Sequence, residues 1–258
     1  MKYFKEIAIY IGLPLIFLAI MAFKNINHRN MITSIQQDSQ DKGFAVVELF
    51  TSEGCWSCPP ADELIARLQK GNNNQQLYIM AFHVDYWDHQ GWKDRFSQAD
   101  FTERQKQYAA WLRLGNIYTP QLVVNGKTEM VGSDEGAVLG AISAALRGAT
   151  APPLTLKAEQ GNGTLTITYA GAVPHKKARL LTALVQKTAR SEVNAGENAG
   201  KQLSHVQIVR QLQQQELKEQ GTVTLKLPAG FRAGDWEVIT FVQQKNTGEI
   251  TQAAKLTW

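Results

Sequence analysis

The stretch FAVVELFTSEGCWSCPPADELIARL, residues 44–68, decides the fold. Its first part, residues 44–50, is a short apolar run that predicts a buried strand, and the polar turn TSEG ends that strand. Apolar residues then recur on one face of a predicted helix over residues 59–70, whose two prolines stand in the first turn, where they are tolerated. The two cysteines of the chain, Cys55 and Cys58, therefore lie at a strand-to-helix turn.

Further elements continue this pattern over the first half of the chain. We expect a strand, a helix, a hairpin and a helix, in that order, at residues 77–84, 98–114, 121–131 and 134–147. Asn125-Gly126 in the hairpin is a strong signal for a tight turn. Either Ser133 or Asp134 can cap the last helix. The predicted order is therefore β-α-β-α-β-β-α, ending near Gly148.

The sequence changes in character after residues 149–153. Residues 154–258 contain about seven short runs of alternating polarity, separated by Gly, Asn and Pro turns, which predict an antiparallel β-sandwich or barrel. Residues 202–219 fit a helix as well as a strand. The predicted fold class is an α/β domain at residues 43–150 with a separate all-β, sandwich-like domain at residues 151–258.

Composition and charge narrow the class of protein. The chain has 258 residues, of which 44% are hydrophobic and 19% charged, so it can bury a substantial core and is not a disordered chain. Its net charge is +4, but residues 1–30 carry four basic groups against one acidic group, a surplus of +3. The remaining +1 on residues 31–258 disfavours a nucleic-acid-binding protein, and we expect no nucleic-acid partner.

The N-terminus has the pattern of an export signal. Residues 7–23 form an unbroken run of 17 apolar residues after the basic stretch MKYFKE, as in the n-region and h-region of a secretory signal. A buried core helix is the alternative. We expect residues 1–30 to be a signal peptide or membrane anchor and residues 31–42 to be a linker. The protein is then exported, periplasmic or secreted, and touches a membrane only through this segment.

Cys55 and Cys58 stand where a thiol becomes reactive. A helix N-terminus presents unpaired N–H groups and a positive dipole end, which stabilise the thiolate that attacks disulfides. The spacing brings the second thiol within reach of a mixed disulfide formed by the first. Three other interpretations are open. The first is a structural disulfide, although so short a loop removes little entropy from the unfolded chain. The second is a zinc knuckle, which needs two further ligands. The third is two buried thiols that lie close together by chance.

A proline before a buried strand supports the redox interpretation. Thr119-Pro120 precedes the apolar run at residues 121–124, and thioredoxin-fold proteins place a cis-proline loop beside their dithiol at this point. The element order, the C-x-x-C and the Thr-Pro step resemble the thioredoxin superfamily over residues 43–148. Four stretches are similar to a family of secreted, thioredoxin-like proteins of unassigned function: VELFTSEGCWSCPPAD, FHVDYWDHQGWKD, TPQLVVNG and GENAGKQLSHVQIVR.

The resemblance implies roles for the site residues. Cys55 would be the attacking, more exposed thiol, Cys58 the resolving thiol, and Pro120, in cis, a contact for a bound peptide or thiol. Trp56 and Thr119, beside these residues, would also contact the substrate. Two features depart from a thioredoxin: Trp-Ser stands between the cysteines in place of Gly-Pro, and Pro-Pro follows the second one. The redox direction therefore does not carry over.

Acidic and aromatic residues near the dithiol are further candidates. Glu48, in the first strand, can accept the proton of the resolving thiol, as a buried Asp does in thioredoxins, although strand alternation does not settle where it points. In the insert at residues 85–97, Asp85 and Trp87 can wall a substrate pocket, and His83 or Asp85 can move protons. The alternative is a local aromatic core with solvated acids around it.

A Gly-rich loop in the second half, VNAGENAGKQLSH at residues 193–205, carries four polar candidates: Glu197, Asn198, Lys201 and His205. The main interpretation is a turn that needs positive φ at Gly196 and Gly200. The alternative is a ligand loop that faces the dithiol.

The sequence thus predicts a thiol–disulfide oxidoreductase in which Cys55 attacks and Cys58 resolves. Its partners would be protein or small-molecule thiols and disulfides, and we expect no cofactor and no bound metal. Two other functions remain open. One is a metal-binding or metallochaperone protein that holds copper or zinc with Cys55, Cys58 and His83. The other is a non-catalytic envelope binding module whose activity lies in the β domain.

Overall fold

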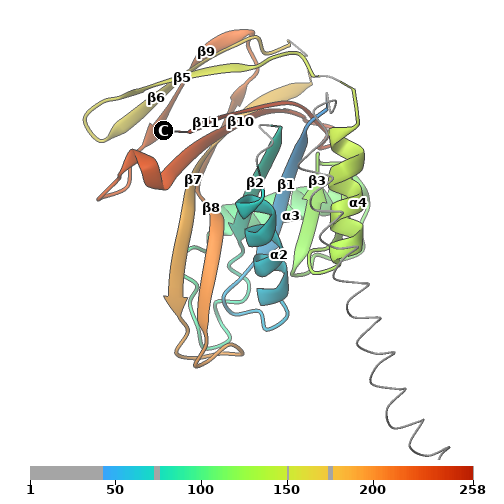
Figure 1. Cartoon of the computed structure of the whole chain (residues 1–258), viewed down its shortest axis with the longest axis vertical. Coiled ribbons are helices and arrows are strands. Elements are labelled where there is room, and N and C mark those ends of the chain that lie inside the picture. The colour runs from blue at the N-terminus through green and yellow to red at the C-terminus, as the bar shows by residue number, and fades with distance from the viewer. Residues whose placement is uncertain (1–42, 73–75, 150, 174–176, 258) are drawn as a thin grey trace, which may run out of the picture. The chain divides into compact units, whose positions relative to one another are not determined.

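The structure is a computed structural model and describes residues 43–72, 76–149, 151–173 and 177–257 (Figure 1). Residues 40–258 form one compact unit. The apolar run at residues 7–23 lies outside the described residues, as does the linker predicted at residues 31–42. None of the helices within the described ranges is long and apolar enough to cross a membrane.

The elements alternate at first and then become strands only. The first half contains β1 (Ala45–Thr51), α2 (Pro59–Lys70), β2 (Leu77–His83), α3 (Ala99–Leu112), β3 (Gln121–Val124), β4 (Thr128–Val131) and α4 (Glu135–Leu146). The second half contains β5 (Thr155–Gln160), β6 (Thr164–Ala170), β7 (Ala178–Glu192), β8 (Gln202–Glu216), β9 (Gln220–Lys226), the short 3-10 helix η1 (Ala233–Asp235), β10 (Trp236–Gln244) and β11 (Ile250–Thr257).

The predicted elements of the first half occur in the predicted order, with bounds that differ by at most two residues. Asn125 and Gly126 have positive φ and turn the hairpin between β3 and β4. Asp134, rather than Ser133, caps α4, because its carboxylate accepts a hydrogen bond from the N–H of Ala137 at 3.1 Å. Local patterns therefore predict local structure well in this half.

One large mixed sheet connects the two halves. Within the described residues it has eight strands in the order β11-β10-β7-β8-β2-β1-β3-β4, and β5, β6 and β9 form a second sheet. β1 and β2 are parallel, and β8 joins β2 in parallel through the pair Ala81 and Ile208. Figure 1 shows the long β7–β8 hairpin running beside β2.

The predicted fold class, a thioredoxin-like α/β domain with a separate all-β domain, is therefore wrong. The β8–β2 pairing makes one sheet of strands from both halves, and one buried core cluster combines Phe82 and Tyr108 with Val209 and Phe241. The physical reason is the edge of β2, whose unpaired N–H and C=O groups need a partner. β8 covers that edge.

Residues 202–219, for which helix and strand were both open, form β8 up to Glu216 and the short connection to β9. β8 pairs with β7 along most of its length, from Gln202 opposite Glu192 to Glu216 opposite Arg179. The pairing provides the backbone hydrogen bonds that a helix would otherwise supply. The loop between these two long strands is the Gly-rich segment, and it reaches the turn after β1.

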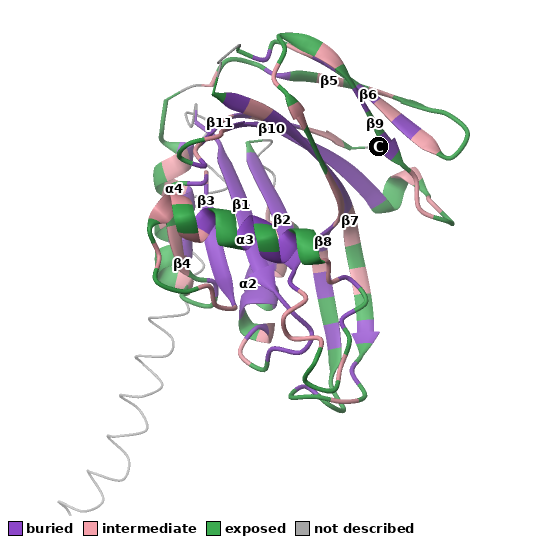
Figure 2. Cartoon of the chain, turned by 180° about the vertical axis from the view of Figure 1, so that it is seen from behind, coloured by how far each residue is buried: buried purple, intermediate pink, exposed green. Residues whose placement is uncertain are grey.

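Helices cover both faces of the sheet in the region of β1 and β2. α2 lies on one face and α3 on the other, as Figures 1 and 2 show from opposite sides. All residues of both strands are buried for this reason. The side chains of β1 alternate between the faces, so Glu48 contacts α3 while Leu49 packs on the opposite side, close to Gly132 and Ala61.

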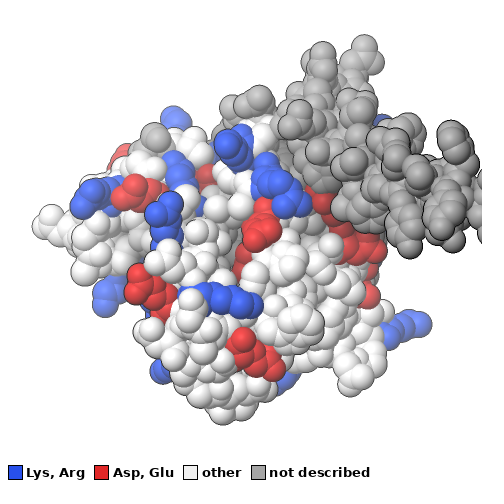
Figure 3. All heavy atoms as spheres, turned by 60° about the horizontal axis from the view of Figure 1, so that its bottom comes forward, with Lys and Arg blue, Asp and Glu red and all other residues white. Residues whose placement is uncertain are grey.

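The surface charge is mixed. On the face shown in Figure 3, the Lys and Arg side chains of the described residues are interspersed with Asp and Glu side chains.

Candidate functional site

Cys55 and Cys58 form a disulfide in the turn between β1 and α2, with their Cα atoms 5.4 Å apart. Cys58 is the N-cap residue of α2, and its N–H donates to the carbonyl of Cys55 at 3.2 Å. Both cysteines are 0% exposed, so the greater exposure expected for Cys55 is absent from the disulfide form. Trp56 between them is 66% exposed and marks the turn on the surface.

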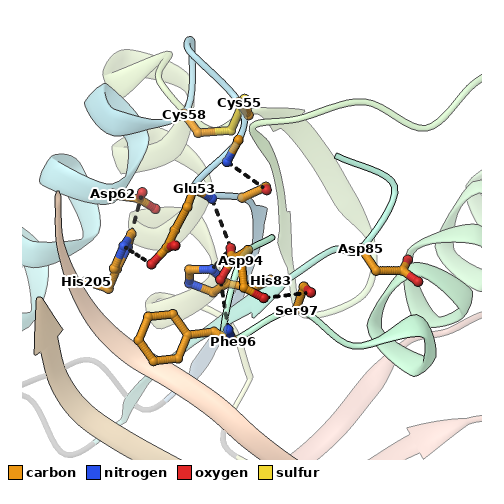
Figure 4. Close-up of polar contacts among 12 residues, drawn as sticks. Glu53, Cys55, Cys58, Asp62, His83, Asp85, Asp94, Phe96, Ser97 and His205 are labelled. Atoms are coloured by element: carbon orange, nitrogen blue, oxygen red, sulfur yellow. Dashed lines mark hydrogen bonds and ion pairs between the residues drawn. A yellow bond between two sulfur atoms is a disulfide. The ribbon is translucent and has the colours of Figure 1, made fainter. Parts of the chain in front are cut away.

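A network of buried ionisable groups lies beneath this turn (Figure 4). Glu53, two residues before Cys55, is 0% exposed. Nε2 of His205 lies 3.4 Å from Oε1 of Glu53, and Nδ1 of the same ring lies 3.6 Å from Oδ2 of Asp62 on α2. Asp62 follows Cys58 by one helical turn, so the two carboxylates flank the cysteine pair in the sequence and converge on one imidazole.

These contacts set the charge states of the network. Burial alone would lower the pKa of His205, but the contacts with Asp62 and Glu53 raise it to about 9, so the ring is a cation at neutral pH. Burial would raise the pKa of Glu53, but the contact with His205 and the hydrogen bond from Trp92 hold it below its usual value. The result is a buried cation between carboxylates.

A second acid–imidazole pair continues the network. Nδ1 of His83, at the end of β2, lies 2.6 Å from Oδ2 of Asp94, which also accepts the backbone N–H of Glu53 at 2.9 Å. Burial would raise the pKa of Asp94, but the charge of His83 and its hydrogen bonds hold it below its usual value. The rings of His83 and His205 meet edge to face with centroids 4.9 Å apart. His83 thus belongs to the network of buried groups beneath the cysteine turn.

This geometry does not favour the metal-binding alternative. Over the described ranges, no three or more His, Cys, Asp and Glu side chains are grouped so as to hold a metal ion. The Nδ1 atom of His83 is already engaged with Asp94.

The Gly-rich loop between β7 and β8 contacts the cysteine turn directly. Gly196 and Gly200 have φ of 74° and 82°, so both adopt the positive φ predicted for them. The side-chain amide of Asn198 donates to the carbonyl oxygens of Glu53 and Cys55, both at 2.9 Å. The loop is therefore a turn, as the main interpretation predicted, and also a clamp on the cysteine turn, whereas a ligand role for the loop stays a prediction.

The same loop reaches the residue between the cysteines. Oε2 of Glu197 accepts a hydrogen bond from the backbone N–H of Trp56 at 3.1 Å. Lys201 fixes the side chain of Asn198, because its Nζ donates a hydrogen bond to Oδ1 of Asn198 at 2.8 Å. The second half of the chain thus positions the backbone of the C-x-x-C turn.

The proline loop also lies close to the start of α2. The Thr119–Pro120 peptide bond is cis, as expected. A Cβ added to Gly132 would lie 3.2 Å from Cβ of Ala61 and 3.3 Å from Cβ of Pro120, so Gly132 separates the proline from the first turn of α2.

Trp87 connects the proline loop with the cysteine turn. Its indole N–H donates to Oγ1 of Thr119 at 2.9 Å, and its Cβ would lie 3.1 Å from a Cβ added to Gly54. Of the residues proposed to bind substrate, Trp56, Trp87 and Thr119 are therefore brought to one region.

Two predicted site residues lie elsewhere. Asp85 is held at the start of α3, where its Oδ1 accepts the hydroxyl of Thr102 at 2.5 Å, and Figure 4 shows it apart from the disulfide. Glu48 faces α3, where its oxygens accept hydrogen bonds from Arg104 at 2.5 and 2.8 Å and from the hydroxyl of Tyr108. The structure therefore does not place Glu48 beside Cys58.

Two buried acids beside the turn, Glu53 and Asp62, were not predicted, whereas Asp94 belongs to the insert that was considered as a pocket wall. Glu53 stands in the predicted polar turn TSEG, Asp62 in the first turn of a helix, and Asp94 at the end of the aromatic insert. Acids at such positions are normally exposed. The spacing from Cys58 to Asp62, one helical turn, was the one available signal.

Comparison with known proteins places this arrangement in a family. The profile of DUF1223, described as a protein of unknown function, matches residues 46–243. The chain belongs to the DUF1223 family. The matched region includes the cysteine turn, the proline loop and the clamp loop, so the whole site lies within the family's common region.

Solved structures similar to this DUF1223 chain include a protein that matches it over most of its length. A crystal structure of a protein from Agrobacterium tumefaciens, a structural genomics target, has a TM-score of 0.64 at 28% identity and covers 85% of this chain and 96% of its own. A domain of the outer membrane lipoprotein Omp28 from Porphyromonas gingivalis has a TM-score of 0.25 at 14% identity, covering 41% of this chain and 85% of its own. Among curated proteins, none matches.

Proposed function

We propose that this DUF1223 protein is an exported thiol–disulfide oxidoreductase that acts through Cys55 and Cys58. The observation that carries the proposal is the disulfide at the start of α2, with the cis Thr119–Pro120 step held close by through Trp87. Dithiol oxidoreductases of the thioredoxin superfamily combine the same elements.

The disulfide contributes little to the stability of the fold, which supports a chemical role. A bond across two intervening residues removes little entropy from the unfolded chain. The turn is instead fixed by other contacts, from Asn198 to two carbonyl oxygens and from Glu197 to Trp56. Opening the disulfide therefore leaves the turn with its own supports.

The proposed reaction is a reversible exchange in two steps. In the direction that oxidises the protein, the thiolate of Cys55 attacks a disulfide of the partner, forming a mixed disulfide and releasing one partner thiol. Cys58 then attacks the sulfur of Cys55, which forms the internal disulfide and releases the second partner thiol. Because both cysteines are buried in the oxidised form, regeneration of the dithiol requires a local opening of the turn, and the exposed Trp56 marks the side of approach.

The proposal includes export of the protein from the cytoplasm. The apolar run at residues 7–23 would direct the chain out of the cytoplasm, either as a cleaved signal or as an anchor. The partners would then be thiols and disulfides of the envelope or the exterior, where disulfides persist.

The test is capture of the mixed disulfide. We expect full-chain Cys58→Ala, incubated with oxidised glutathione, to gain one glutathione on Cys55, as measured by mass spectrometry. Wild-type protein reduced with a dithiol should return to the internal disulfide without a stable adduct, and Asn194→Ala, the control at an exposed position of the loop between β7 and β8, should behave like wild type. The proposal fails if Cys58→Ala gains no adduct and the native disulfide resists excess dithiol while the protein stays folded.

A further inference from the structure

We infer that the Cys55–Cys58 pair is a reducing couple, whose dithiol form gives electrons to disulfides of its partners. The inference rests on the proposed function and adds its direction. It is based on the contacts around the turn, which already engage the groups that would otherwise stabilise a thiolate.

Thiolate stabilisation decides the direction of such a couple. A dithiol whose thiolate is stabilised stays reduced, and its disulfide form is a strong oxidant. The usual source of this stabilisation at a helix start is the set of free N–H groups there and the positive end of the helix dipole. A turn without free donors, or with a carboxylate beside it, therefore favours the disulfide and makes the dithiol a reductant.

The helix start in this protein lacks two of these donors. Pro59 and Pro60 occupy the first two positions of α2, and proline has no backbone N–H. The next two N–H groups, of Ala61 and Asp62, both donate to the carbonyl of Cys58, at 2.9 and 3.1 Å. The first turn of α2 therefore offers little to a sulfur.

The backbone N–H groups of Gly54, Cys55 and Cys58, before the helix, are also engaged. The N–H of Cys55 donates to the carbonyl of Ser52 and that of Cys58 to the carbonyl of Cys55, both at 3.2 Å. The N–H of Gly54 donates to the hydroxyl of Ser52 at 3.1 Å. The hydroxyl of Ser57, 3.4 Å from the sulfur of Cys55, is the neutral polar group that remains in contact with it.

A carboxylate takes one of the two backbone donors that lie between the cysteines. Oε2 of Glu197 binds the N–H of Trp56 at 3.1 Å, which both occupies this donor and places a negative charge beside the turn. The buried cation of the site, His205, lies between Glu53 and Asp62, and these two carboxylates balance its charge. The charges around the turn thus disfavour a thiolate on Cys55.

The direction fixes the place of the protein in a reaction sequence. The dithiol loses two electrons and two protons to become the internal disulfide, and the partner's disulfide becomes two thiols. A thiol reductant must then return two electrons and two protons to the Cys55–Cys58 disulfide. The reaction that precedes this one is therefore the oxidation of a thiol donor, and the substrate is an oxidised, disulfide-containing partner.

The experiment is a redox equilibrium of the full chain in glutathione buffers at pH 8.5, with the reduced fraction measured by thiol alkylation. We expect wild-type protein to stay oxidised unless reduced glutathione is in large excess. Glu197→Gln, which removes the charge, should move the equilibrium constant about fivefold toward the dithiol, because a thiol pKa near the working pH falls by about one unit. Pro59→Ala, which restores an N–H, should move it the same way.

The control is Glu192→Gln, which removes an exposed carboxylate from the same hairpin, one that contacts Gln202 rather than the turn, and it should leave the equilibrium unchanged. A second readout is the thiol pKa of Cys55 in Cys58→Ala, expected at or above the ordinary value of about 8.5. Ready exchange with a predominantly reduced wild type, or variants that shift the equilibrium toward the disulfide, would overturn the reducing direction and leave the proposed function intact. Failure to exchange at all would instead overturn the proposed function.

Discussion

His205 on β8 lies 3.4 Å from Glu53, two residues before Cys55, and joins the second half of the chain to the cysteine turn. The contact is fully buried on both sides. A buried ion pair is costly to break because the partner left behind stays charged without compensation. The strands that follow residue 150 therefore complete the site rather than form a structure beside it.

His205→Gln should destabilise the protein in a pH-dependent way. The folded pKa of His205 is about 9 against about 6.5 when unfolded. The protonated ring therefore stabilises the fold fully below pH 6.5, and this contribution is lost as the pH rises toward 9. We expect the free energy of unfolding of the variant to lie about 3 kcal/mol below wild type at pH 6, with a difference that shrinks by pH 9, measured by urea denaturation.

His89→Gln is the matched control for that series. His89 is exposed on the insert, and its replacement should change the free energy of unfolding by less than about 0.5 kcal/mol at either pH. A loss for His205→Gln that is constant from pH 6 to pH 9 would contradict the charge assigned to the ring.

Asn198→Ala should loosen the cysteine turn. The variant removes the side-chain donor to the carbonyl oxygens of Glu53 and Cys55, of which the second keeps the N–H of Cys58, and the loss costs about 2 kcal/mol. We expect faster reduction of the native disulfide by dithiothreitol, followed by mass spectrometry of alkylated protein. Asn194→Ala, an exposed asparagine of the same loop, should be reduced at the wild-type rate, and equal rates for the two variants would show that the clamp does not hold the turn.

Glu48→Gln should affect stability and not redox chemistry. Arg104, 3% exposed, would lose its buried counter-charge, and we expect a loss of about 3 kcal/mol in the free energy of unfolding. The double variant Glu48→Gln, Arg104→Met should recover part of this loss, because it leaves no unpaired charge. The reduction equilibrium of Cys55–Cys58 should match wild type in Glu48→Gln, and a shift would restore Glu48 as a candidate proton acceptor.

Gly126→Ala tests the contact between the β3–β4 hairpin and the turn before β11. Gly126 has φ of 66°, and an added Cβ would lie 1.9 Å from the carbonyl oxygen of Gly248. We expect a loss of more than about 2 kcal/mol in the free energy of unfolding. Gly163→Ala has a similar φ of 70° but open space around it, so its loss should stay near 1 kcal/mol. Equal losses for the two variants would mean that the positive φ determines the cost and that the contact with Gly248 adds nothing.

Short-range signals were enough for the elements and for the centre of the site. Hydrophobic period, prolines in the first turn of α2 and Asn125-Gly126 determined where strands, helices and the hairpin form. The spacing of Cys55 and Cys58 predicted the pair, and its position before a helix predicted its neighbourhood. The two glycines of the clamp loop, Gly196 and Gly200, were likewise recognisable from residue type alone, because they supply a positive φ at little cost.

Long-range contacts were beyond such signals. The pairing of β8 with β2, which makes one sheet of both halves, depends on an exposed strand edge and on two long strands more than 100 residues away in sequence. Strand alternation puts Glu48 on one of the two faces of the sheet, but it does not say which face. Only the folded chain, which brings Arg104 to that face, determines that Glu48 points to α3. Nothing local in Glu53 distinguishes it from an ordinary surface acid, and for Asp62 the spacing of one helical turn from Cys58 is the only local signal.

The sequence by itself determined the elements of the first half, their order and the position of the cysteine pair, because propensity, periodicity and turn chemistry act between near neighbours. Only the tertiary structure decided that β8 joins the sheet at β2, that Asn198 and Glu197 hold the cysteine turn, and that His205 compensates Glu53 beneath it. These contacts join residues about 140 to 150 positions apart, and they form only when burial brings unpaired groups together and makes leaving them unpaired costly.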